Sequence, residues 1–148
     1  MRASFLALFL AAGLLVFLST NTIASETIGI IKSVTGEVYL TNTISYIKAA
    51  PNMKLNQGDS IRTGPSSNAG IIFDDDTVVS LGSNSEMSIE KFLFDPASEK
   101  LAFVTRLLQG TFSFISGQIA KLAPDQVKIE TPDATLGVRG TKFLVKID

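Results

Sequence analysis

The sequence predicts a single all-β domain, either sandwich-like or a short irregular β-coil, behind an N-terminal signal peptide. Two observations predict the fold. Apolar and polar residues alternate in short runs along most of the chain from Thr27 onward, as in strands with one buried face. Glycine, proline, asparagine and aspartate separate these runs at intervals typical of β-turns. A third observation, an apolar run at the N-terminus that does not alternate, predicts the signal peptide.

The N-terminal run has the features of a secretory signal. Met1-Arg2 precede an apolar stretch from Ala3 to Leu18, and Thr22-Ile23-Ala24 supplies the small residues that a signal peptidase needs. We therefore expect a signal peptide over residues 1–24 and a domain over residues 25–148. The alternative is an uncleaved membrane anchor, which the length disfavours because a spanning helix needs about 20 apolar residues.

Composition excludes several classes of function. Without Arg2 the chain has 12 basic and 14 acidic residues, a net charge of −2, which argues against a nucleic-acid surface. It contains neither cysteine nor histidine. Nucleophile pairs that use histidine, and metal sites built on imidazole or thiolate, are therefore excluded. We expect no enzymatic activity and no cofactor.

The first two thirds of the domain predicts short strands joined by tight turns. The chain opens with one or two strands bent at Gly36, and a strand at 44–48 folds back across Asn42-Thr43. The clearest hairpin joins Ile71 and Phe73 to Val79 and Leu81 through three aspartates. The expected strands are one or two with buried residues from Ile28 to Leu40, then Ile44 to Lys48, a very short one between the turns at 58–59 and 64–65, the hairpin strands around Ile71-Phe73 and Thr77 to Leu81, and a strand from Met87 and Ile89 into Phe92-Leu93-Phe94.

The segment from Ala97 to Gln109 is ambiguous, because its apolar residues fit either a helix or a strand. We predict a strand, since the next segment alternates and a tight Gln109-Gly110 turn would pair the two. Ser116 to Pro124 is the other place where a short helical turn is expected.

The C-terminus predicts two strands around a rigid corner. Val127 and Ile129 alternate with polar residues before the corner, and Phe143, Val145 and Ile147 do so after it. Glycines bracket Val138-Arg139 and permit a positive φ or a close backbone approach. The candidate corner residues are Thr131, Pro132, Gly137, Arg139, Gly140 and Thr141.

The last strand, Thr141 to Ile147, is a candidate contact edge. No later hairpin in this sequence covers its outer side, so its backbone groups would be open to a partner strand. Lys142 and Lys146 would discourage indiscriminate pairing, and Leu144 between them would give a partner an apolar contact.

Other conspicuous residues have ordinary structural interpretations. Asp74-Asp75-Asp76 could suggest a calcium site, but the spacing and the following valines favour a solvated hairpin turn. Arg139 could hold an anionic ligand, although a structural role, either a pair with Glu130 or Asp133 or donation to backbone carbonyls at the corner, is the commoner use. The carboxylates Glu86, Glu90, Asp95 and Glu99 have no spacing that makes an acid–base pair, and we place them on exposed faces. The phenylalanines Phe92, Phe94, Phe103, Phe112 and Phe114 are expected in the core and not on a stacking surface.

Three separated segments together resemble the FecR domain. These segments are Gly58-Asp59-Ser60-Ile61-Arg62-Thr63-Gly64, the run from Phe73 to Ser85, and Thr131-Pro132 followed by Gly137-Val138-Arg139-Gly140-Thr141. The resemblance covers nearly all of the expected domain and implies an exported, all-β, non-catalytic module. In the full-length ferric-citrate-type regulators such a domain lies in the periplasm, behind a cytoplasmic anti-sigma region and a transmembrane helix, and receives a signal from an outer-membrane transporter. This sequence departs from that plan, because only two residues precede the apolar segment. Its turn also has Asp75-Asp76 where the family usually has Asp-Gly, which suggests a differently shaped turn.

Two functions remain open from the sequence. The first is a non-enzymatic binding or sensor module of FecR type, periplasmic or secreted, that acts through a protein partner in the envelope. The alternative is a structural envelope scaffold without a sensing role. We expect no nucleic-acid partner, and membrane contact only if the signal segment stayed uncleaved. A pull-down from envelope extract separates the two, since a sensor brings down a transporter or signalling protein and a scaffold brings down wall or membrane material.

Overall fold

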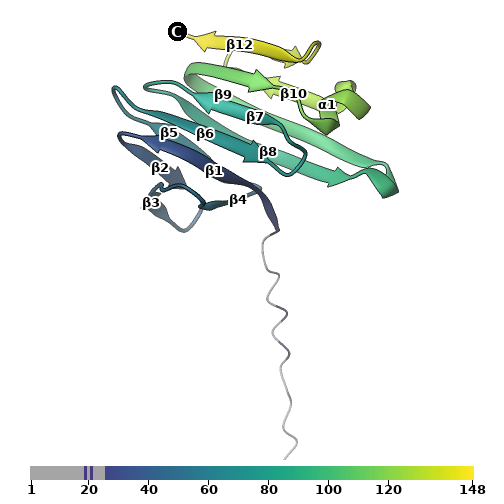
Figure 1. Ribbon diagram of the computed structural model, residues 1–148, viewed down its shortest axis with the longest axis horizontal. Helices are drawn as coiled ribbons and strands as arrows, with labels where there is room; N and C mark the ends of the chain where they lie inside the picture. The colour runs from purple at the N-terminus through teal and green to yellow at the C-terminus, as the bar shows by residue number, and fades with distance from the viewer. Residues whose placement is uncertain (1–18, 20, 22–25) are drawn as a thin grey trace, which may run out of the picture.

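The computed structural model of the chain describes residues 19, 21 and 26–148, so the expected signal peptide lies outside the described part of the chain apart from two isolated residues. The regular structure of the described part is mainly β-strand, with one short α-helix and two 3-10 turns, which confirms the predicted class (Figure 1). Its strands are β1 Thr27–Thr35, β2 Val38–Thr41, β3 Tyr46–Lys48, β4 Lys54–Asn56, β5 Ser60–Thr63, β6 Asn68–Phe73, β7 Val78–Leu81, β8 Glu86–Asp95, β9 Lys100–Ile115, β10 Val127–Glu130, β11 Thr135–Gly137 and β12 Lys142–Ile147.

All twelve strands belong to one curled sheet, in the order β3-β2-β5-β8-β9-β7-β6-β1-β4. On the other side of β9, β10 and β12 pair with its two ends, and β11 extends β10. We call β12, the end of β9, β7, β6, β1 and β4 the first half-sheet. The second half-sheet contains β11, β10, the start of β9, β8, β5, β2 and β3. The pairing is antiparallel except between β9 and β10.

Strand β9 joins the two half-sheets. Its first ten residues pair with β8, and its last residues pair with β7. Between them Gly110 has φ +100, and a Cβ at this position would overlap Ser85. The ambiguous segment is therefore a strand, as predicted. The predicted Gln109-Gly110 turn is wrong, because the glycine bends one continuous strand toward a new neighbour instead of reversing it.

The concave side of the curl holds the core, which is built from the inward parity of each strand. Phe73 of β6, Phe92 of β8 and Phe103 of β9 meet with ring centroids 5.0–5.8 Å apart, so residues from both half-sheets share one aromatic cluster. Phe114 of β9 stacks on Phe143 of β12 at 5.0 Å. The expectation that the phenylalanines are core is confirmed for all but Phe94, which is only partly buried against the core.

The smaller predicted elements are also present. The hairpin of β6 and β7 pairs Ile71 with Val79, and β3 folds back on β2. After β9 a short helix, α1 Gln118–Leu122, occupies the expected helical turn. The 3-10 turns Pro96–Ser98 and Pro124–Gln126 complete the fold. Within the described residues no helix combines the length and apolar character needed to cross a membrane.

Candidate functional site

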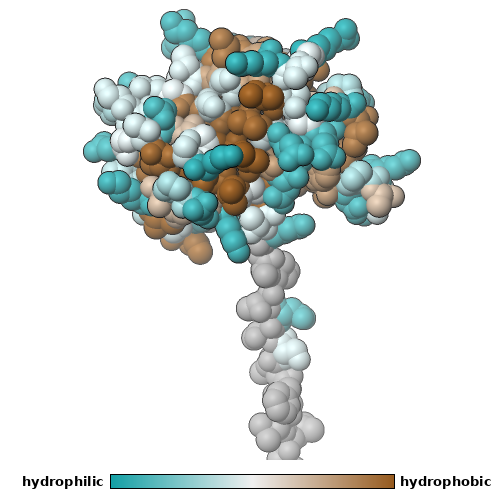
Figure 2. All heavy atoms as spheres, in the orientation of Figure 1, coloured by the Kyte–Doolittle hydropathy of each residue, from teal (hydrophilic) through white to brown (hydrophobic). Residues whose placement is uncertain are grey.

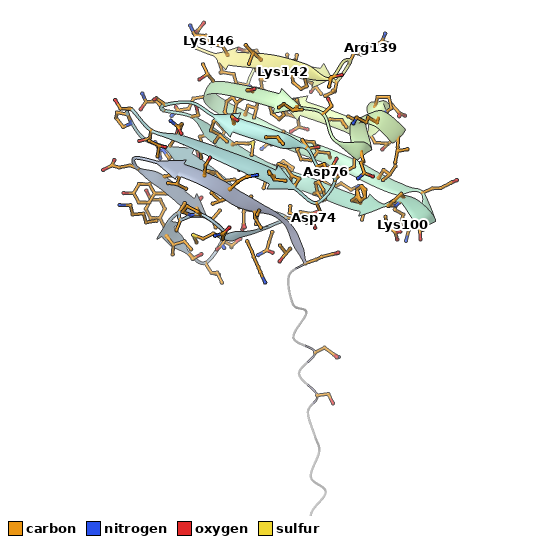
Figure 3. The ribbon with its side chains drawn as sticks, in the orientation of Figure 1. Asp74, Asp76, Lys100, Arg139, Lys142 and Lys146 are labelled. Atoms are coloured by element: carbon orange, nitrogen blue, oxygen red, sulfur yellow. The ribbon has the colours of Figure 1, made fainter. Side chains whose placement is uncertain are left out.

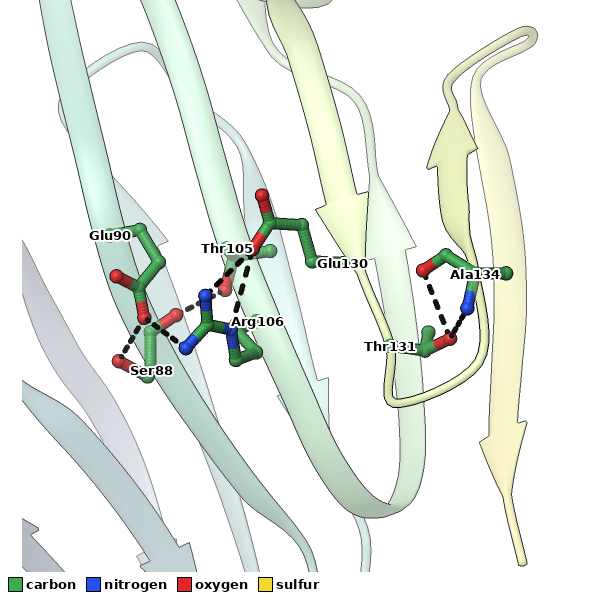
Figure 4. A network of polar contacts seen from close by, with 7 residues as sticks. All are labelled: Ser88, Glu90, Thr105, Arg106, Glu130, Thr131 and Ala134. Carbon is green, nitrogen blue, oxygen red and sulfur yellow. Dashed lines mark hydrogen bonds and ion pairs between the residues drawn. The ribbon is translucent and has the colours of Figure 1, made fainter.

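The C-terminal corner begins with a tight hairpin between β10 and β11. The Thr131 N–H donates to the Ala134 carbonyl at 2.7 Å, and the Thr131 hydroxyl accepts from the Ala134 N–H at 3.1 Å (Figure 4). Pro132 lies in the turn that these bonds close. The sequence predicted a bare corner at this place, and the structure adds the short strand β11, because Gly137 pairs with Lys128 across the hairpin.

The second part of the corner connects β11 to β12. Val138 is 6% exposed and anchors the connection in the core, whereas its neighbours face solvent. Gly140 has φ +96, as predicted for a corner glycine, and its carbonyl accepts from the Ser116 hydroxyl at 3.0 Å. The Ser116 N–H also donates to the Thr141 carbonyl at 2.8 Å, so the end of β9 holds the corner. Gly137 has no positive φ and no close neighbour, which corrects the expectation for that glycine.

Arg139 is exposed and does not form the predicted pair. Glu130 instead binds Arg106 of β9, with Nη2 and Oε2 3.2 Å apart, and Arg106 Nη1 lies 3.9 Å from Glu90 Oε1 (Figure 4). Arg139 makes no ion pair with any residue that the structure describes. The prediction failed because the parallel pairing of β10 with β9 brings Glu130 opposite Arg106, a proximity that sequence order does not reveal.

The candidate edge, β12, pairs with β9 along its whole length and with no other described strand. Phe143, Val145 and Ile147 are half-buried toward the core, while Lys142, Leu144 and Lys146 face outward. Leu144 is 77% exposed. Figure 3 shows Lys142, Lys146 and Arg139 projecting from this end of the molecule. Among the strands of residues 26–148, none pairs with the other side of β12, so its backbone donors and acceptors on that side are unpaired within this part of the chain.

A groove of about 910 Å³ lies between the β10–β11 hairpin and β12. Its apolar lining includes Val127, Leu136, Val138 and Leu144, and Lys128, Arg139 and Asp125 provide the charges. The corner and the edge therefore meet in one open depression. An extended chain lying in this groove would meet both the backbone groups of β12 and apolar side chains.

The three aspartates of the β6–β7 turn have different environments, so the prediction of a uniformly solvated turn is wrong. Asp75 is fully buried and accepts from the Thr77 hydroxyl at 2.8 Å, the Thr77 N–H at 3.1 Å and the Ile119 N–H at 3.1 Å. Its carboxylate thereby fastens the turn to the start of α1. Asp76 has φ 70, the conformation that a glycine would favour at this point of the turn.

Asp74 is exposed and has the one perturbed pKa resolved in the described part of the chain. Partial burial raises the pKa of Asp74 above 3.8, and the nearby charges of Glu26 and then Asp75 add to the increase. Within residues 26–148 no group of three acidic side chains is arranged to hold a metal ion. The turn therefore has a structural role. Asp75 connects it to α1, and the pKa of the outer Asp74 is raised by burial and by the neighbouring carboxylates.

The chain is similar to a known family over the regions described above. A family model described as FecR protein matches residues 59–148, which include the aspartate turn, the corner and β12. No curated protein and no solved structure matches the chain. The FecR domain is associated with cell-surface signalling and is not known as an enzyme. Because the match spans more than half of the chain and contains the three segments of the resemblance almost in full, this protein belongs to the FecR family.

Proposed function

We propose that this protein is a non-enzymatic FecR module of the cell envelope that binds an extended segment of a partner protein along β12. The observation that carries the proposal is the pairing of β12 on one side only, next to the open groove. A partner strand would pair with the free backbone groups of β12 and place alternate side chains against Leu144 and Leu136. Such addition needs no catalytic group and leaves the core unchanged.

We propose that the protein is located in the periplasm or is secreted into the medium. The apolar run at residues 3–18 and the small residues before Ser25 support export, and the family's association with cell-surface signalling agrees with that location. In this role the module would report or transmit the presence of its partner. A scaffold without sensing would instead hold envelope material and would not need the groove.

Site-specific photo-crosslinking in cells tests the contact. A photoreactive amino acid at Leu144 should yield a defined adduct with one envelope protein, because this side chain is exposed beside the free edge. The matched control carries the same group at Leu93, which is exposed on β8 in the second half-sheet. A second variant, Leu144→Lys, should weaken co-purification of the crosslinked protein without unfolding the domain.

The outcomes are separable. An adduct at position 144 but not at position 93, whose identified partner is lost with Leu144→Lys, supports the proposal. Equal adducts at both positions, or a partner retained by the folded Leu144→Lys variant, would contradict it. An adduct with wall or membrane material alone would favour the scaffold.

A further inference from the structure

The outer face of the first half-sheet has an apolar row that the proposed function does not use. The register places Ile30 beside Ile72, Ile72 beside Val78, and Val78 beside Ile115. Paired residues of neighbouring strands point to the same side of a sheet, so the four side chains form one line across β1, β6, β7 and β9. Ile30 is 36% exposed and Ile115 is 40% exposed. Figure 2 shows a hydrophobic stripe across this part of the visible face.

A row of small residues runs beside the apolar row. Ser33 pairs with Gly70, Gly70 with Ser80, and Ser80 with Ser113. Because these side chains are short, the apolar row stands above its surroundings as a ridge. Neighbouring strands lie about 4.8 Å apart, so the ridge is about 14 Å long across the convex face of the curled sheet.

Lysine residues close the ridge at both ends. Lys54 of β4 pairs with Ile30, and Lys142 of β12 pairs with Ile115. The strand segments of this half-sheet contain four charged residues in the described chain, and all four are lysines. The two others are Lys32 and Lys146, of which Lys146 pairs with Asp148 at 3.5 Å. Strands of the second half-sheet carry both signs of charge.

Acidic groups lie beyond the strands at one end of this face. Asp74 and Asp76 occupy the β6–β7 turn, two positions from Ile72 and Val78, and Glu26 lies close enough to Asp74 to contribute to its raised pKa. The charge on this face is therefore asymmetric, with carboxylates at the end formed by the β6–β7 turn and lysines along and beyond the ridge. A flat anionic surface would therefore meet the ridge and the lysines while the turn tilts away.

We propose that this face lies on the surface of an anionic lipid bilayer, with the ridge in the headgroup region and the lysines on lipid phosphates. Aliphatic side chains gain free energy by leaving water at that boundary, and long lysine side chains reach phosphates while their stems stay on apolar surface. A second copy of the chain fits less well, because face-to-face contact would bring eight lysines together without a strand carboxylate. This inference uses the outer face of the sheet, to which Lys142 and Leu144 of β12 also point, and not the backbone edge of β12 on which the proposed strand pairing depends.

Vesicle co-sedimentation of the exported protein tests the proposal. It should bind vesicles rich in phosphatidylglycerol and not vesicles of phosphatidylcholine, and the binding should weaken as salt rises from about 0.01 to 0.15 M. The double variant Lys54→Gln/Lys142→Gln should lower the partition coefficient about tenfold or more. Ile30→Thr/Ile115→Thr should lower it as well, since threonine keeps the β-branched shape but exposes a hydroxyl.

Matched controls lie on the second half-sheet. Lys91→Gln/Lys100→Gln removes the same charge from β8 and β9, and Leu93→Thr/Leu108→Thr removes apolar side chains that are 38% and 40% exposed. Both controls should bind like the unmodified protein. Lys142 belongs to the candidate contact edge, so Lys54→Gln alone, which leaves β12 unchanged, is the variant whose result is independent of the photo-crosslinking experiment.

Three results would overturn the proposal. These are binding to neither kind of vesicle, equal binding to both kinds, and equal losses in the controls and the face variants. A concentration-dependent dimer that disappears with Ile30→Thr/Ile115→Thr would assign the ridge to a second copy instead. Circular dichroism of each variant verifies folding, and the lysine variants decide the question if the threonine variant unfolds.

Discussion

At the scale of single residues, the aspartate turn shows how neighbours of one type acquire different roles. Asp75 lies inside and satisfies three donors, while Asp74 and Asp76 lie outside. A buried carboxylate is costly unless donors surround it, and the Ile119 N–H at the start of α1 supplies the long-range one. Asp75 thus connects the β6–β7 turn to the helix, while Asp76, at the position where the family usually has glycine, takes the positive φ of 70°.

We predict that Asp75→Asn destabilises the domain by about 2–4 kcal/mol, because an amide offers fewer acceptor positions and turns a donor toward buried donors. Urea unfolding followed by circular dichroism measures the change. Asp76→Asn is the matched control and should stay within about 0.5 kcal/mol, since its side chain is exposed and asparagine tolerates a positive φ. Equal effects of the two substitutions would show that the buried carboxylate has no special role.

Asp74 gives a prediction with a pH signature. Its pKa is raised in the folded state, so the folded protein binds more protons there than the unfolded chain, and stability from this group falls as pH rises through the raised pKa. Asp74→Asn should therefore raise the urea midpoint near pH 7, and the gain should shrink near pH 3, where the carboxyl is protonated in both states. A gain that is independent of pH, or a loss near pH 7, would show that the pKa of Asp74 is not raised in the folded state.

At the scale of elements, β9 decides the architecture by bending at Gly110. The bend passes the strand from β8 to β7 and leaves its other side for β10 and β12. Just beyond the bend, the Thr111 N–H donates to the Ser85 hydroxyl at 3.0 Å. This bond holds β9 against the residue before β8 at the point where β9 passes from one half-sheet to the other.

Gly110→Ala should destabilise the domain by about 3 kcal/mol or more, because the new Cβ needs an unfavourable φ and overlaps the Ser85 backbone. Gly137→Ala is the control: its φ is ordinary and no atom lies within 4 Å of the added Cβ. That change should be neutral or stabilise by up to about 1 kcal/mol. Thermal melting of both variants makes the comparison, and a mild effect at position 110 would contradict the bent-strand account.

The edge strand β12 predicts a pattern of amide hydrogen exchange. In the isolated protein, amides of β12 that bond to β9 should exchange slowly, and the alternate amides that face the groove should exchange fast. A bound partner strand should slow the second set. Protection of every amide from Lys142 to Lys146 in the unbound monomer would show a strand paired on both sides, and the binding proposal would be withdrawn.

At the scale of the whole molecule, the expected export of the protein agrees with the surface features that we propose to bind components of the envelope. The first half-sheet combines an apolar ridge with lysines, and β12 at its margin borders the groove. The register that puts Lys142 beside Ile115 also puts Leu144 beside Ser113, so the Leu144 side chain points to the same outer face as the ridge, while the backbone edge of β12 points sideways. A module of this kind would hold a partner segment close to a lipid surface.

Processing at the N-terminus is the prediction for the entire chain. Mass spectrometry of the exported protein should find Ser25, or a residue within one or two of it, as the first residue, because Thr22-Ile23-Ala24 best satisfies the peptidase. Ala24→Arg should block the cut and retain the precursor. Recovery of intact Met1 from the membrane fraction of unmodified cells would establish an anchor instead.

The sequence by itself determined the strand class, the buried parity of most strands and the β6–β7 hairpin, and it marked Gly140 as one of two corner glycines able to take a positive φ. Those features depend on alternation and turn chemistry within a few residues, which the order of residues carries directly. The tertiary structure alone decided that β9 continues through Gly110, that Asp75 is buried and that Glu130 binds Arg106 instead of Arg139. Each of these depends on which distant strand or helix lies alongside. Long-range pairing selects that neighbour by burying shared surface, so no local pattern can announce it.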